Sequence, residues 1–268
     1  MLHAYGLKLG VKLLLRGKWR RSLHYLVIPV NYWRALEFRL VWNEVGFHVG
    51  DRVLDIGSPK LLSLYVARKT GAEVFATDIE DYFVDEYRLL RQMEGVPAER
   101  FHIQVEDGRR LSFPNGCFSK VYSISVLEHI PDVGDTACAR EMARVLAEGG
   151  RCAITVPFSP DSLVEHRRDD FYWAQSSVGV EDGEFFFQRK YSEEDLFTRL
   201  INPSGLRLRK LGFIGERVTV GPGRELMDLL PPVTGPIQPL LSRLFLSKPV
   251  ESWKELKKPL CALIVLEK

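Results

Sequence analysis

Apolar residues recur along this chain in two alternating patterns, and these patterns define the elements that we expect. Short apolar runs bounded by Gly, Asp or Pro predict strands, whereas longer stretches with apolar residues on one side predict helices. Strands are expected at residues 52–56, 73–77, 101–105, 120–124 and 151–156, and helices at 61–69, 84–91 and 135–146. Strands that alternate with helices indicate an α/β fold whose parallel sheet is covered on both faces.

The pattern changes before and after this central region. Residues 1 to about 45 predict two helical segments that break near Pro29. Gly149 and Gly150 are expected to close the helix at 135–146 and to lead into the fifth strand. We therefore expect an N-terminal helical extension at 1–45, followed by an α/β domain at 46–268.

Two parts of the α/β domain do not follow the strand–helix pattern. Residues 157–190 have no clear periodicity and are rich in aromatic and charged side chains, and residues 221–259 contain several prolines. We interpret both as insertions. Between them, Ser192 with Asp195 three positions later is typical of a helix start. Strands are expected at 206–213 and 262–266.

Candidate chemistry is concentrated between residues 51 and 80. An apolar strand ends in Asp55 and Gly57, a helix follows, and a second strand ends in Asp78. A glycine at such a turn lets the backbone approach a ligand without a Cβ in the way. A carboxylate at the end of the second strand can accept hydrogen bonds from both hydroxyls of a ribose. This order predicts a nucleoside pocket at the carboxyl ends of the strands.

Four segments in the right order carry a resemblance to a known family. They read VLDIGS from Val53, TDIE from Thr77, VEDGRRLSFPNGCFSKVYSISVLEHIPD from Val105 and EMARVLAEGGRCAITVP from Glu141. The chain resembles the class I S-adenosylmethionine-dependent methyltransferases, and is most similar to the type 11-like group that methylates small molecules and lipids. The resemblance covers about residues 50–157 well, and 190–213 and the final strand more loosely.

The resemblance implies a Rossmann-like, doubly wound sheet of seven mostly parallel strands, the last of them antiparallel, with S-adenosylmethionine as cofactor. It also implies a role for each residue of the site. The cofactor's amino-acid end would lie at the turn near Asp55, Gly57 and Ser58, and its ribose would lie at Asp78. Its adenine would lie against Ile79 and Asp107, with Gly108 keeping the approach open. Its sulfonium would lie above Ser123 and Ser125. Glu106, adjacent to Asp107, is an alternative for the adenine amino group.

The turn after the first strand departs from the family pattern. It reads Gly57-Ser58-Pro59-Lys60-Leu61, and the family's two further glycines would fall at Pro59 and Leu61. Proline has no amide hydrogen to donate, and leucine adds bulk where the backbone should approach the ligand. Two interpretations follow: a rearranged turn that still binds the cofactor, or a domain that has lost it.

Catalytic residues are less well defined by the sequence. A base is needed only if the acceptor loses a proton during transfer, and the candidates are His129, His166 and Tyr172. The aromatic runs 171–173 and 185–187 either line an apolar substrate pocket or form the core of a cap. We expect no metal site, because acids and histidines do not cluster at ligand spacing.

Composition adds two expectations about location and partners. The four cysteines are far apart in the sequence, which favours a reducing cytoplasm, and no apolar run is long enough to span a bilayer. Six basic residues and no acid lie between Lys8 and Arg21, although the net charge is only +2. This segment either contacts an anionic membrane peripherally or forms a helix with a solvated basic face over the cofactor site. Nucleic-acid binding is not expected, and the sequence does not determine the oligomeric state.

These observations lead to two functional hypotheses. The first is an enzyme that transfers the methyl group of S-adenosylmethionine to an O, N or C atom of a small-molecule or lipid-like acceptor. The alternative is a non-catalytic, methyltransferase-like binding or membrane-associated module. Pro59 and Leu61 support this alternative, because they replace two glycines of the family's turn. A dehydrogenase is disfavoured because residues 107–132 resemble methyltransferases more closely.

Overall fold

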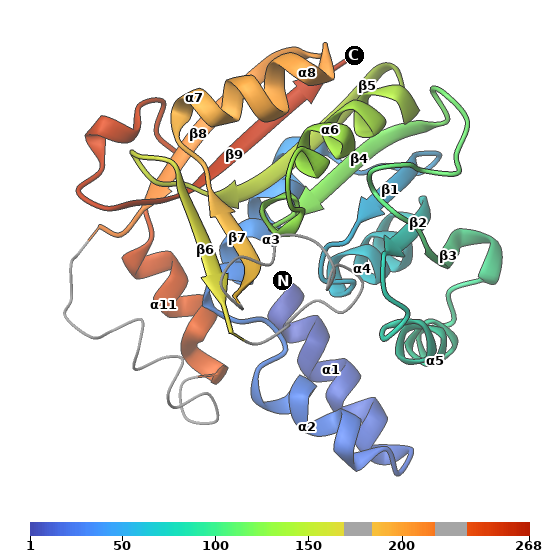
Figure 1. The fold of residues 1–268 in the computed structure, drawn as a ribbon. Coiled ribbons are helices and arrows are strands. Elements are labelled where there is room, and N and C mark those ends of the chain that lie inside the picture. The colour runs from blue at the N-terminus through green and yellow to red at the C-terminus, as the bar shows by residue number, and fades with distance from the viewer. Residues whose placement is uncertain (169–183, 218–234) are drawn as a thin grey trace.

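Figure 1 shows a computed structural model of the chain, which describes residues 1–168, 184–217 and 235–268. Its centre is a seven-stranded sheet with the order β3-β2-β1-β4-β5-β9-β8. The strands are β1 (Arg52–Ile56), β2 (Glu73–Asp78), β3 (Phe101–Val105), β4 (Phe118–Ile124), β5 (Leu146–Pro157), β8 (Arg207–Gly215) and β9 (Pro259–Glu267). Only β9 is antiparallel, and it lies between β5 and β8. The predicted fold class is therefore confirmed.

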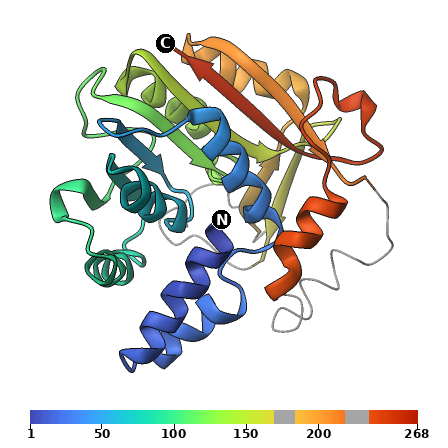
Figure 2. The same cartoon turned by 180° about the vertical axis from the view of Figure 1, so that it is seen from behind.

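Helices cover both faces of the sheet (Figures 1 and 2). The longer helices are α1 (Leu2–Leu15), α2 (Trp19–Val27), α3 (Tyr32–Val45), α4 (Leu61–Thr70), α5 (Val84–Glu94), α6 (Gly134–Val145) and α11 (Gln238–Phe245). Short helical turns lie at Ala98–Arg100, Leu127–His129, Gly235–Ile237 and Trp253–Glu255. Side chains of a strand alternate between the two faces, so Val53 joins the core under α1, α4 and α5, whereas Leu54 joins the core under α6.

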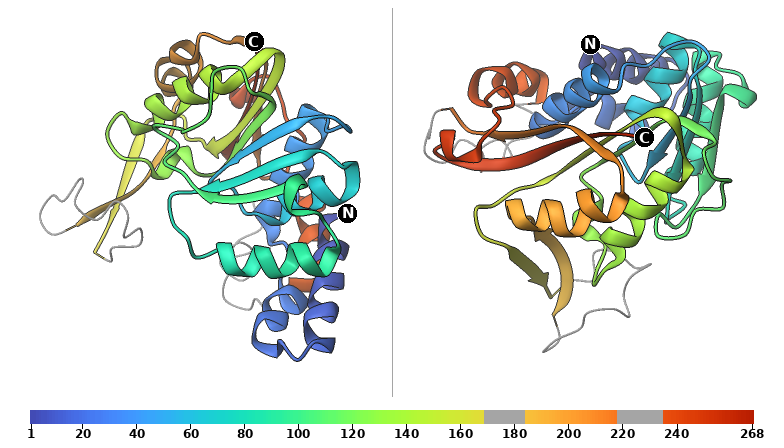
Figure 3. Two further views of the ribbon diagram at one scale, coloured as in Figure 1. Left: turned by 90° about the vertical axis from the view of Figure 1, so that its right-hand side faces the viewer. Right: turned by 90° about the horizontal axis from the view of Figure 1, so that it is seen from above.

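The N-terminal extension differs from the prediction in one respect. The break near Pro29 is present, but the segment before it consists of two helices, α1 and α2, which turn at Gly17 with φ +71°. This left-handed conformation suits glycine because it has no Cβ. The two helices pack side by side and project from the sheet in the views of Figures 1 and 3. α3 instead lies on the sheet and contributes Leu36 and Leu40 to a third core with β8 and β9.

The predicted start of the fifth strand is wrong. β5 begins at Leu146, so Gly149 and Gly150 lie inside the strand and do not close α6. Phe118 of β4 pairs with Leu146, but Lys120 pairs with Arg151, and this change of register absorbs the residues between them. Glycines are typical of such an irregularity within a strand.

The first insertion contains a hairpin that the sequence pattern did not predict. β6 (Leu163–Arg167) pairs antiparallel with β7 (Phe185–Lys190), apart from the main sheet. Both strands are largely exposed or half-buried, which leaves no apolar alternation to detect. The predicted helix start at Ser192 is confirmed, with a reciprocal capping box to Asp195; the helix runs through α7 (Glu193–Asp195), a π-helical turn (Leu196–Ile201) and α8 (Asn202–Ser204).

Candidate active site

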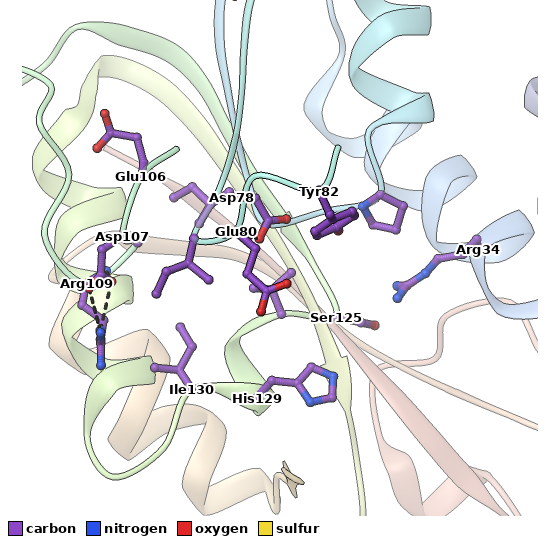
Figure 4. Close-up of a pocket in the computed structure, with 16 residues that line it drawn as sticks. Arg34, Asp78, Glu80, Tyr82, Glu106, Asp107, Arg109, Ser125, His129 and Ile130 are labelled. Carbon is purple, nitrogen blue, oxygen red and sulfur yellow. Dashed lines mark hydrogen bonds and ion pairs between the residues drawn. The ribbon is translucent and has the colours of Figure 1, made fainter. Parts of the chain in front are cut away.

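A cavity of about 270 Å³ lies at the carboxyl ends of the central strands. The residues that follow four strands line it: Gly57 after β1, Ile79 after β2, Asp107 and Gly108 after β3, and Ser125 after β4. Figure 4 shows the acidic, aromatic and histidine side chains that surround it. Parallel strands end at the same edge of a sheet, so residues far apart in the sequence converge there, as ligand sites of such sheets require.

The turn after β1 keeps its glycine where the backbone needs it. Gly57 has φ +68°, and a Cβ at this position would lie 2.5 Å from Cγ1 of Val126. Pro59, the departure from the family pattern, also lines the cavity. The turn therefore stays closely packed against Val126 and contributes Gly57 and Pro59 to the cavity wall without two of the family's usual glycines.

Three predicted cofactor residues lie behind the cavity wall and do not line it. The Asp55 carboxylate is fully buried and accepts hydrogen bonds from the Ser58 amide at 3.1 Å and from the Ser63 hydroxyl. Burial raises the pKa of Asp55, and the Lys60 ammonium counteracts that shift. Ser58 Oγ accepts from the Ile124 amide at 2.9 Å, and Ser123 Oγ donates to the Ile56 carbonyl at 2.9 Å. These contacts join the ends of β1 and β4.

Asp78 and Ile79 line the cavity from the end of β2. The Asp78 side chain is 12% exposed, and its Oδ2 lies 3.4 Å from the buried ammonium of Lys60. Tyr82, from the loop that follows, completes this side of the cavity and appears beside Asp78 in Figure 4. The acid predicted for the ribose is therefore accessible from the cavity and has a cation behind it.

Asp107 lines the cavity beside Gly108, but it is already engaged with a neighbouring side chain. Arg109 donates hydrogen bonds to both of its oxygens, from Nε at 2.9 and 3.0 Å and from Nη2 at 2.8 Å. Burial raises the pKa of Asp107, but the hydrogen bonds and charge of Arg109 outweigh it, so the pKa lies below its ordinary value. Glu106, the alternative, also lines the cavity and accepts from the Ser112 amide at 3.0 Å.

The N-terminal extension supplies two residues that sequence reasoning missed. Arg34 of α3 lines the cavity and donates to Glu37 at 2.7 Å. Glu37 is buried and also accepts hydrogen bonds from Ser125 Oγ at 2.5 Å and Thr155 Oγ1 at 2.9 Å. The one available signal was Glu37 itself, the first acid after a run of apolar and basic residues.

His129 lies at the end of the turn after β4, where this cavity meets a second one. Its Nδ1 is 2.8 Å from the Phe187 carbonyl, so this nitrogen carries the hydrogen, since a carbonyl can only accept. Burial lowers the pKa of His129 to about 4, which makes the ring neutral at physiological pH. Nε2 then has a lone pair, and it lies 3.8 Å from Oε1 of Glu128.

The second cavity has a volume of about 500 Å³ and shares Arg34, Ser125 and His129 with the first. Its wall combines apolar and aromatic side chains from α3, the end of β5, the hairpin and the start of β9, among them Trp33, Phe158, Leu163, Phe187 and Leu260. Phe187 belongs to the aromatic run 185–187 that the sequence analysis considered for a substrate pocket.

Of the other two catalytic candidates, only His166 is among the described residues, and it does not lie at this junction. His166 lies on β6 with its side chain exposed, and it lines neither cavity. Tyr172 and the aromatic run 171–173 lie outside the described residues. Within the described ranges, no group of three His, Cys, Asp or Glu side chains is arranged to hold a metal ion.

The buried Glu128 is expected to make the stability of the folded protein depend on pH. Burial raises its pKa from an ordinary 4.5 to about 8, so the folded protein retains a proton that the unfolded chain loses. Stability is therefore full below about pH 4.5 and falls as the pH rises toward 8. Glu128→Gln carries no such proton, and we expect its melting temperature relative to wild type to increase between pH 5 and pH 8.5.

Thermal unfolding at pH 5, 7 and 8.5 measures this effect. Glu148→Gln, at an exposed position, serves as the control and is expected to follow wild type at every pH. A difference between Glu128→Gln and wild type that stays constant with pH would contradict the protonated state of Glu128.

Comparison with known proteins agrees with this geometry. Residues 54–154 match the model of a methyltransferase domain. Methyltransferase GfsG of Streptomyces halstedii is 28% identical over 73% of this chain and 67% of its own length. The ubiquinone biosynthesis O-methyltransferase of Xanthomonas euvesicatoria is 36% identical over 40% of this chain and 43% of its own.

Solved structures extend the likeness of fold over most of the chain. The [4+2]-cyclase SpnF has a TM-score of 0.58 at 15% identity and covers 88% of this chain and 80% of its own. Geranyl diphosphate C-methyltransferase from Streptomyces coelicolor, solved with S-adenosylhomocysteine, has a TM-score of 0.55 at 12% identity, covering 87% and 77%. Residues 54–154 therefore form a methyltransferase domain, and the comparisons support the predicted class, the class I S-adenosylmethionine-dependent methyltransferases, with S-adenosylmethionine as the cofactor.

Proposed function

We propose that the first cavity holds S-adenosylmethionine, that the second holds a small-molecule or lipid-like acceptor, and that the methyl group passes between them beside His129. The observation that carries this proposal is the junction itself. Arg34, Ser125 and His129 line both cavities, so a donor in one and an acceptor in the other would meet there. Alignment of the two reactants is the main contribution that the protein would make.

The residues of the first cavity fit the cofactor. Gly57 lines this cavity, and its missing Cβ lets the turn pack closely against Val126, which also lines the cavity. Asp78 would accept from the ribose hydroxyls, Ile79 would pack on the adenine, and Asp107 would accept from the adenine amino group beside Gly108. Arg34 would pair with the cofactor's carboxylate. Asp55, Ser58 and Ser123 would act indirectly, by holding the turn in place.

The chain's own side chains would then serve the transfer itself. The bound cofactor supplies a methyl group that its sulfonium already makes reactive. Ser125 and Arg34, tied together through Glu37, would hold the junction in shape. If the acceptor is a hydroxyl, its oxygen would take the methyl group and its proton would pass to Nε2 of His129.

The lining of the second cavity supports an acceptor that has an apolar part and a polar group. Trp33, Phe158, Leu163, Phe187 and Leu260 offer apolar surface, and charged and polar residues share the wall, among them Arg34, Glu37, Glu128, His129, Gln188, Lys190 and Lys258. Among similar proteins are a tocopherol O-methyltransferase of Oryza sativa and a sterol 24-C-methyltransferase of Gibberella zeae, named for lipid-like acceptors. The chain spans 67% of the length of GfsG and less than half the length of the three other relatives named here. Their acceptors belong to those proteins, and a partly apolar acceptor is our proposal for this chain.

Isothermal titration calorimetry tests the cofactor site directly. We expect S-adenosylmethionine and S-adenosylhomocysteine both to bind with one site per chain. No heat with either compound at high protein concentration would exclude the proposed function and favour the non-catalytic alternative.

We also propose that the protein is cytoplasmic and contacts anionic membranes peripherally through the tip of the α1–α2 pair, residues 14–21. All eight of these residues are exposed, including Leu15 at 81% and Trp19 at 55%, and the four cysteines are free thiols. The tip also carries four cations, and no acid precedes Glu37 in the chain. In the described ranges, every helix is too short or too polar to cross a bilayer. Exposed apolar and basic side chains together favour the surface of an anionic bilayer.

Sedimentation with vesicles tests whether the tip of the α1–α2 pair binds membranes. Replacing both Leu15 and Trp19 with serine is expected to weaken binding to phosphatidylserine-containing vesicles roughly tenfold or more, because burial of each side chain contributes about 1.5 to 3 kcal/mol when complete. Val49→Ser is the matched control, since Val49 is also 81% exposed but lies in the loop before β1. Unchanged binding of the double variant would contradict the role of the tip.

A further inference from the structure

The departure from the family pattern places a buried cation behind the cofactor cavity. Lys60 follows Pro59 in the turn after β1, and its side chain is only 2% exposed. We propose that Lys60 is a positioning residue, an internal cation that holds Asp78 in the orientation needed to bind the cofactor's ribose. This inference rests on the proposed function, because it concerns the same cofactor site.

The contacts of the Lys60 ammonium come from the ends of β1 and β2, two of the four strands that build the site. Nζ donates to the Ser58 carbonyl at 2.5 Å and lies 3.4 Å from Asp78 Oδ2 and 3.8 Å from Asp55 Oδ2. The ring of Phe83 lies with its centroid 5.0 Å from Nζ, within the range of a cation–π interaction. A buried charge is tolerated only when such partners replace its hydration.

The Lys60 ammonium reaches Asp78 without lining the cofactor cavity. Lys60 instead lines a neighbouring cavity of about 480 Å³, which is formed by α2, α3, the turn after β1 and the start of α5 and shares Arg34, Pro59 and Tyr82 with the cofactor cavity. Asp78 lines the cofactor cavity itself. The cation can therefore hold one oxygen of Asp78 from behind while the carboxylate remains open to a ribose in front.

The same ammonium offsets a second, deeper carboxylate. Asp55 is fully buried, and Lys60 is the charge that lowers its pKa against the effect of burial. Because Asp55 holds the turn through Ser58 and Ser63, one side chain links the shape of the turn to the position of the ribose acid. The turn has lost an amide donor at Pro59 and has gained an ammonium one residue later.

A comparison of two ligands isolates the positioning effect from general stability. Calorimetry would measure the affinity of Lys60→Met and wild type for S-adenosylhomocysteine and for its 2′,3′-dideoxyribose analogue, which lacks both hydroxyls that Asp78 would bind. We expect wild type to prefer S-adenosylhomocysteine, and Lys60→Met to reduce this preference about tenfold. Lys60→Arg, which keeps the cation, is expected to restore part of it. Lys69→Met, at an exposed position near the end of α4, is the matched control.

A second variant addresses a possible loss of folding. Lys60→Met leaves Asp55 buried with no counter-charge, and the double variant Lys60→Met/Asp55→Asn removes both charges. We expect the double variant to recover thermal stability but to keep the reduced preference for the intact ribose. The inference would be overturned if Lys60→Met or the double variant preferred S-adenosylhomocysteine over the dideoxyribose analogue as strongly as wild type does. Failure of the wild type to bind S-adenosylhomocysteine would overturn the proposed function as well.

Discussion

Replacing Asp78 with alanine is expected to weaken S-adenosylhomocysteine binding by about 3 kcal/mol, roughly 100-fold. A carboxylate that accepts from two ribose hydroxyls forms charge-assisted hydrogen bonds, and each of these contributes more than a neutral one. Asp78 is 12% exposed, and its Oδ2 lies 3.4 Å from the buried Lys60 ammonium, a contact that restricts rotation of the carboxylate. An alanine would remove both acceptors and leave Lys60 with one fewer partner.

Calorimetry with S-adenosylhomocysteine measures this loss. Asp78→Asn separates charge from shape, because it keeps one acceptor oxygen, and we expect it to lose less affinity than Asp78→Ala. Asp81→Ala is the control, since Asp81 is an exposed acid three residues away and is not among the residues that line the cavity. An affinity of Asp78→Ala within about twofold of wild type would show that the ribose lies elsewhere.

Replacing Asp135 with alanine is expected to destabilise the protein by about 3 to 5 kcal/mol, the usual cost of removing one partner from a buried ion pair. Asp135 lies at the start of α6 and is fully buried. Its oxygens accept from Arg199 at 2.8 Å, from Tyr191 Oη at 2.9 Å and from Arg189 at 3.2 Å. Without the carboxylate, two guanidinium groups would remain buried or half-buried without this partner.

This cluster also ties the hairpin to the body of the protein. Arg189 belongs to β7 and Arg199 to the π-helical turn, so the substitution is expected to loosen the wall of the second cavity. Thermal denaturation should show a fall in the melting temperature of roughly 10 °C or more. Glu148→Ala, an exposed acid within β5, is the control. A melting temperature within about 2 °C of wild type would show that the cluster does not stabilise the fold.

Most of the sheet could be predicted because most of its strands have a local sequence signal. β1 and β3 have the predicted bounds, and β2 extends by one residue to Asp78. These strands are short apolar runs between turn residues, a signal that survives without tertiary context. The hairpin β6–β7 was missed because it packs apart from the main sheet and its side chains do not alternate between buried and exposed.

The cofactor side of the site could be predicted only in part. Gly57, Asp78, Ile79, Asp107, Gly108 and Ser125 line one cavity because each ends or follows one of the parallel strands of the sheet. Asp55 and Ser123 lie inside β1 and β4, and Ser58 lies in the turn after β1; all three side chains are buried within the wall. The end of a strand decides which edge of the sheet a residue reaches. Whether its side chain points outward or inward depends on the alternation along the strand and on the backbone of the turn.

The sequence by itself determined the alternation of strands and helices between residues 52 and 157, the resemblance to a family with its cofactor, and the edge of the sheet where the acids gather. Only the tertiary structure decided what surrounds those acids. It brought Arg34 and Glu37 from α3 to Ser125, set His129 between two cavities, and placed the Lys60 ammonium behind Asp78. The reason is physical: periodicity and turn chemistry act over a few residues, whereas burial and charge pairing depend on which distant segments pack together.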